Sequence, residues 1–245
     1  MEKKKLELTS ASLHLLAMVF MLCDHLWATI IPGNQWLTTV GRLTYPIYAF
    51  LLVEGYFHTR SVKKYALRLL ALAVVSEIPF NLMYSSQLVY PVHQNVIWTL
   101  LIGLGCVHLN ERVKERGMVL RILTAGGTLL GGALLGLLSF ADYNAAGVLT
   151  ILVFYFFRGR KWWCLAGQIA ALWWLNVEVL KGLAFEVELF GETHFIVQQG
   201  FALLALIPIW LYRGRKGRDS RVFQYACYAF YPLHMLALHL IRGMI

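Results

Sequence analysis

The amino-acid sequence predicts an all-α membrane protein, a polytopic bundle of about nine transmembrane helices in a single domain spanning residues 1–245. Hydrophobic residues make up 59% of the chain and charged residues only 14%, whereas a soluble domain is nearer a quarter charged. Several apolar runs reach about 20 residues, which is long enough to cross a bilayer as a helix. The basic residues gather in short clusters between these runs, as expected of cytoplasmic loops.

The first predicted helix covers residues 12–31 and follows a basic arm with Lys3, Lys4 and Lys5. An uncharged turn separates it from the second helix, and a glycine-rich fifth helix suits close helix packing. The later helices are expected at 36–57, from the end of the 58–68 link to 84, at 95–110, around 124–136, from the 141–144 link to 157, and at 162–179, 195–212 and 222–241.

The links alternate in charge, which predicts the orientation of the chain. Basic links follow every second helix, at 58–68, 111–121, 158–161 and 213–218, and the link 181–194 is acidic, with Glu186, Glu188 and Glu192. By the positive-inside rule the N-terminus lies in the cytoplasm and the C-terminus outside. We therefore interpret the net charge of +9 as a topology signal, and we expect no nucleic-acid partner.

Polar residues inside the apolar runs mark the candidate site. Asp24 and His25 interrupt the first run, and ionisable groups within a membrane are costly and indicate function. The predicted topology places further polar residues in the same outer layer as this pair, and these are Arg42, Glu77, Asn81, Asn95, Asp142 and His234. A shared depth predicts a polar cavity.

These residues also have structural interpretations. Arg42 could neutralise Asp24 or Glu77, because buried charges need partners. Glu77 with Pro79 could mark a helix kink, and His234 could donate to a carbonyl freed by Pro232. No pattern that ligates a metal is found, and we predict no metal.

Sequence blocks along nearly the whole chain point to one family. They include Met21-Leu22-x-Asp24-His25, Val40-Gly41-Arg42-Leu43-x-Tyr45-Pro46, Glu77-Ile78-Pro79-Phe80-Asn81, Ala141-Asp142-Tyr143 and Tyr231-Pro232-x-His234. Together they resemble the TraX family of integral membrane proteins, which is named for an enzyme that N-acetylates pilin. The chain is also similar to membrane acyltransferases that use acyl-CoA.

The resemblance implies an acetyltransferase of the bacterial inner membrane, with acetyl-CoA as co-substrate. The acceptor is unknown, and a peptide N-terminus, an amino sugar and a glycan are all compatible. His25 is the expected general base, Asp24 or Glu77 would orient it, and Arg42 or Asn81 would stabilise the oxyanion. The residues expected to bind the cofactor are Arg60, Lys63, Lys64, Arg68, Glu54 and Asn95.

Two other functions fit the same residues. A proton-coupled transporter or flippase would use the buried Asp, His, Arg and Glu as a relay. A structural assembly factor would use them only for helix packing. Release of CoA that requires both acetyl-CoA and an acceptor distinguishes the enzyme, and substrate flux without bond cleavage distinguishes the transporter.

Overall fold

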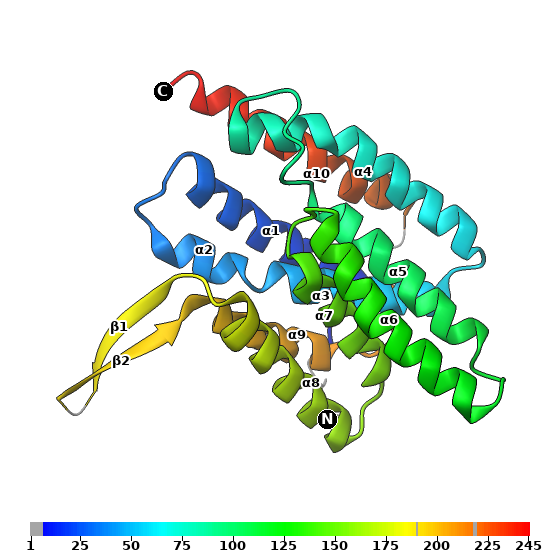
Figure 1. Ribbon diagram of the computed structural model, residues 1–245. Helices are drawn as coiled ribbons and strands as arrows, with labels where there is room; N and C mark the ends of the chain where they lie inside the picture. Colours follow the sequence, from blue (N-terminus) through cyan, green and yellow to red (C-terminus); the bar gives the residue numbers. More distant parts are fainter. Residues whose placement is uncertain (1–6, 190, 218–219) are drawn as a thin grey trace, which may run out of the picture.

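The computed structural model describes residues 7–189, 191–217 and 220–245, so the predicted basic arm at Lys3–Lys5 lies outside the described residues. The chain forms a helical body from which one β-hairpin extends (Figure 1). The α-helices are α1 (Ser10–Thr29), α2 (Gln35–Gly41), α3 (Thr44–His58), α4 (Val62–Ser85), α5 (Val96–Arg112), α6 (Met118–Leu138), α7 (Asn144–Phe156), α8 (Trp162–Trp173), α9 (Leu206–Leu211) and α10 (Arg221–Arg242).

Side-chain caps explain where several of these helices begin. Thr9 accepts a hydrogen bond from the backbone N–H of Ser12 at the start of α1, and Ser61 does the same for Lys64 in α4. Asn95 caps α5 and Ser220 caps α10. Each cap satisfies a backbone donor that has no partner within its helix.

Four helical segments of the described chain are long and apolar enough to cross a membrane. They are Ser10–Thr29, Val62–Ser85, Met118–Leu138 and Trp162–Leu180, the last of which joins α8 to the π-helix η1 (Trp174–Leu180). The helical bundle is therefore confirmed, while the count of nine spans and their orientation remain predictions.

The single helix predicted at 36–57 is wrong, because α2 and α3 are separate helices with a break at Arg42 and Leu43. Pro46 lies in the first turn of α3, where the N–H that proline lacks would have no helical partner. A side chain at Gly41 would overlap the side chain of Asp24. Glycine therefore allows α2 to approach α1 closely just before the break.

The all-α prediction also needs correction at the acidic link 181–194. Residues Ala184–Leu189 (β1) and Glu192–Val197 (β2) form an antiparallel hairpin in which Ala184 pairs with Val197 and Leu189 with Glu192. Alternating acidic and apolar residues in β1 suit a strand. The helix predicted from residue 195 consequently begins at Gln198, as the 3₁₀-helix η2 (Gln198–Ala205) followed by α9.

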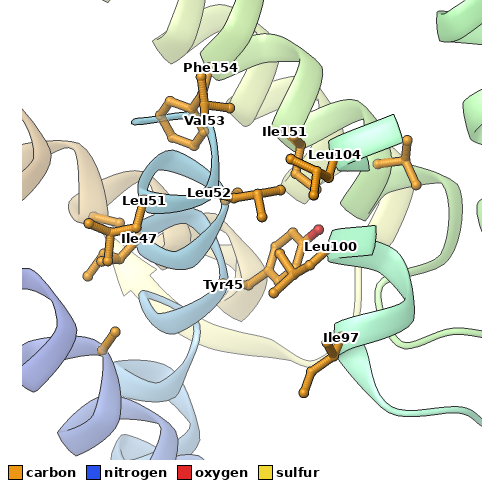
Figure 2. Packing of buried hydrophobic residues seen from close by; sticks show 14 of the residues in the cluster. Tyr45, Ile47, Leu51, Leu52, Val53, Ile97, Leu100, Leu104, Ile151 and Phe154 are labelled. Atoms are coloured by element: carbon orange, nitrogen blue, oxygen red, sulfur yellow. The ribbon is translucent and has the colours of Figure 1, made fainter. Parts of the chain in front are cut away.

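Helix α3 lies in the buried core, against α5 and α7 (Figure 2). Leu52 of α3, Leu104 of α5 and Ile151 of α7 are each less than 5% exposed. Close approach of α5 and α7 requires Gly103, where a side chain would overlap Ile151. The opposite face of α3 is directed toward α1, α4 and α10, and the candidate site lies there.

Candidate functional site

One cavity of about 850 Å³ lies among α1, α3, α4 and α10. Its lining runs along α1 from Ser10 to His25, a helical distance of about 22 Å. Asp24, His25 and Tyr84 line one end, which we call the His25 end. The other end, which we call the basic end, is lined by Arg60, Lys64, Arg68 and Lys216. We call this cavity the central cavity. It connects the lysine and arginine side chains of the basic end with His25, the histidine identified from the sequence.

His25 is paired with His234, which lies 209 positions further along the chain. The His25 Nδ1 and His234 Nε2 atoms are 2.7 Å apart, and the residues are 7% and 8% exposed. His234 Nδ1 lies 2.7 Å from the backbone oxygen of Phe230. Since a carbonyl oxygen only accepts, His234 donates from Nδ1 and, when neutral, accepts at Nε2. His25 therefore donates from Nδ1 and keeps a free lone pair on Nε2.

Asp24 does not orient His25, because its carboxylate forms an ion pair with Arg42. Thr38 donates to the same carboxylate oxygen at 2.7 Å. Arg42 also donates from Nε to the Thr38 carbonyl at 3.1 Å and from a terminal nitrogen to Gln199 at 3.3 Å. Gln199 in turn donates to Asn176 at 3.0 Å. This network ties α1 and the α2–α3 break to η1 and η2.

Glu77, Asn81 and Asn95 do not line the central cavity. Glu77 accepts hydrogen bonds from Asn95 and, at 3.0 Å, from the indole of Trp98. Asn95 also caps α5, and Asn81 donates to the Leu88 carbonyl at 3.2 Å. The predicted polar layer is therefore not one cluster, because His25 pairs with His234, Asp24 with Arg42, and Glu77 with Asn95. His234 takes the place beside His25 that was expected for Asp24 or Glu77.

Of the residues expected to bind the cofactor, Arg60, Lys64, Arg68 and Glu54 line the central cavity, whereas Lys63 and Asn95 do not. Glu54 accepts a hydrogen bond at 2.8 Å from Arg158, so its charge is matched by a cation. The basic end consequently presents lysine and arginine side chains to the cavity with its carboxylate neutralised.

Sequence reasoning did not single out Thr38, Thr44, Tyr84, Asn176 or Gln199. Thr44 and Tyr84 line the cavity, and the Thr44 hydroxyl oxygen is buried without a hydrogen-bond partner. Asn176 and Gln199 are polar residues within apolar segments, which is the signal that could have identified them. Nothing in the local sequence marks Tyr84 or Thr44.

His93, in the loop before α5, faces the Asp142 carboxylate, with 3.6 Å between His93 Nε2 and Asp142 Oδ1. The interaction with Asp142 raises the pKa of His93 above its ordinary value, against the opposing effect of burial. A raised pKa in the folded state means that the pair stabilises the fold fully below the ordinary histidine pKa and is lost as the pH rises through the raised value.

We expect His93→Gln to remove this pH dependence. The wild-type protein should lose roughly 0.2–1 kcal/mol of stability between about pH 5.5 and about pH 8.5, as for a partly exposed ion pair. The variant should be less stable than wild type at the lower pH and equal to it at the higher pH. Thermal unfolding of both proteins at the two pH values measures this, and an unchanged pH slope in the variant would contradict the assignment.

Comparison with known proteins finds similarity over most of the chain. The family model described as "TraX protein" matches residues 9–242. A protein of Dichelobacter nodosus described as "Probable fimbrial assembly protein FimC, serogroup H1" is 28% identical over 254 residues, which covers 96% of each chain. No solved structure matches the chain.

Proposed function

We propose that this chain, which belongs to the TraX family, is a membrane-embedded acyltransferase. It moves an acetyl group from acetyl-CoA to an amine or hydroxyl of an acceptor. The observation that carries the proposal is the central cavity, which connects the cations of the basic end with a histidine whose Nε2 is free. The similarity to a fimbrial assembly protein supports a pilus or fimbrial subunit as one candidate acceptor.

The basic end is the proposed binding site for the phosphates of CoA. Arg60, Lys64 and Arg68 come from the start of α4 and the link before it, and Arg and Lys are the side chains that bind phosphate. The uncharged pantetheine arm would extend along α1 and bring the thioester to His25. Because acetyl-CoA is a cytoplasmic metabolite, the proposal implies that the basic end faces the cytoplasmic side of a bacterial inner membrane.

His25 is the proposed general base. Its Nε2 accepts the proton of the acceptor amine or hydroxyl as that group attacks the thioester carbonyl. When the tetrahedral intermediate collapses, the carbon–sulfur bond breaks and the protonated His25 returns the proton to the CoA thiolate. His234 stabilises the imidazolium by accepting from His25 Nδ1. Asp24 and Arg42 hold α1 against the α2–α3 break and so fix the position of His25.

Thr44 is the proposed donor to the oxyanion. Thr44 lines the cavity together with Asp24 and His25, and its hydroxyl oxygen is buried without a hydrogen-bond partner. Arg42 and Asn81 fit this role less well, because each already donates to protein atoms and neither lines the cavity. A buried donor without a partner can serve a developing negative charge at little reorganisation cost.

Two adjacent lysines allow a test of the proposed acetyl-CoA site, because Lys64 lines the central cavity and Lys63 does not. We expect Lys64→Ala to raise the KM for acetyl-CoA by about tenfold, the effect of losing roughly 1.4 kcal/mol from one charge-assisted contact. Lys63→Ala, the matched control, should change KM less than twofold. CoA release by purified protein in nanodiscs gives both constants.

Equal KM values for the two variants would contradict the assignment of the basic end as the phosphate-binding site. If well-folded wild-type protein neither binds acetyl-CoA nor releases CoA, the acyltransferase proposal fails. Transport of a substrate without bond cleavage would then favour the relay mechanism, in which the same buried groups carry protons.

A further inference from the structure

A second cavity of about 450 Å³ lies beside the His25 end, between the loop before α5 and the link from α6 to α7. Its apolar wall contains Val92, Leu137, Leu138 and Phe140, and its polar end contains His93 and Asp142. The mechanism above does not use this cavity.

Asp142 lines both cavities and is the residue that they share in the described chain. The ring of Tyr84 lies close both to His93 of the second cavity and to His25 of the central cavity. Its centroid lies 5.5 Å from that of His93 and 6.1 Å from that of His25. A group bound at Asp142 is therefore one aromatic ring away from the proposed base.

The walls of the second cavity differ sharply from those of the basic end. Leu138, Val92 and Phe140 are 69%, 55% and 53% exposed, so they offer apolar surface to a ligand or to lipid. The polar end carries a carboxylate that is 34% exposed. Such a site matches a ligand with an aliphatic body and a head that donates a hydrogen bond to the carboxylate.

We propose that the second cavity is the entrance for the acceptor, and that the acceptor is an amphiphile with an amine or hydroxyl on an aliphatic body. The Asp142 carboxylate accepts a hydrogen bond from this head and directs it past Tyr84 toward His25. The donor and acceptor thus reach the thioester from opposite ends. The inference rests on the proposed function and adds to it the class of acceptor and the route of entry.

The test compares two amines that differ only in their aliphatic body, ethylamine and n-octylamine. Both are offered with acetyl-CoA to purified full-length protein in nanodiscs, and CoA release is measured. We expect kcat/KM for n-octylamine to exceed that for ethylamine by at least about tenfold, because several methylene groups are buried. Octanol and ethanol form the corresponding pair for a hydroxyl acceptor.

Two variants separate the cavity from simple partition into lipid. Leu138→Asn places a polar group in the apolar wall and should remove most of the preference for the longer amine. Leu134→Asn is the control, because Leu134 lies one turn earlier on α6, is 58% exposed and lines neither cavity. A third variant, Asp142→Asn, should lower kcat/KM for both amines.

The proposal is overturned if the longer compound is preferred in neither the amine pair nor the alcohol pair, or if Leu138→Asn and Leu134→Asn alter the preference equally. Binding of acetyl-CoA and its His25-dependent hydrolysis without acceptor report on the proposed function separately. If these persist while the preference is absent, only the acceptor route fails. If they are absent, the acyltransferase and the acceptor route fail together.

Discussion

Replacing His25 by alanine is expected to lower the rate of acetyl transfer by about 10²–10⁴-fold, the contribution of a well-positioned general base. The reason is geometric, because His25 lines the central cavity and has one ring nitrogen left with a free lone pair. The KM for acetyl-CoA should change little, since the cations of the basic end line the opposite end of the central cavity from His25. Steady-state CoA release with a fixed acceptor measures both quantities.

The matched control is His108→Ala, which removes a histidine that bonds to Tyr56 and lines neither cavity. It should leave turnover within about twofold of wild type, so the loss in His25→Ala cannot be ascribed to histidine removal in general. His234→Leu should give an intermediate loss, because His25 remains but loses the acceptor that fixes its tautomer. Wild-type turnover in folded His25→Ala would exclude the proposed base.

Much of the helical fold follows from the sequence, because long apolar runs and the basic links between them indicate helices even where individual residues depart from the pattern. The two errors have local causes. A continuous apolar run concealed the α2–α3 break, although Pro46 marks a helix start when it lies in a first turn. The charge of the acidic link predicts only a loop, whereas the alternation of Glu186 and Glu188 with apolar neighbours indicates a strand.

The site was predictable in its members and less so in its pairings. Costly polar groups in apolar runs identify Asp24, His25 and His234 without any structure. Which of them meet depends on how helices rotate about their axes, and a single sequence does not fix that rotation. His25 consequently pairs with a histidine rather than a carboxylate, and Glu77 is held by Asn95 and Trp98 away from the cavity.

The ion pair of Asp24 with Arg42 gives the largest expected effect on stability. Asp24→Asn leaves the Arg42 guanidinium without its counter-charge at the α2–α3 break, where both side chains are largely buried, at 18% and 21% exposed. Breaking a fully buried pair costs about 3–5 kcal/mol. We expect about 3 kcal/mol here, because both groups retain some contact with solvent. Unfolding by SDS in mixed micelles, compared between wild type and variant, measures the difference.

A double variant separates the pair from the general importance of either residue. Asp24→Asn combined with Arg42→Gln removes both charges while keeping groups that can bond to Thr38 and Gln199, so it should be more stable than Asp24→Asn alone. If the double variant loses as much stability as the two single variants together, the two side chains act independently. Because the pair fixes α1 beside the break, the double variant should recover stability more fully than turnover, which depends on the placement of His25 to within a fraction of an ångström.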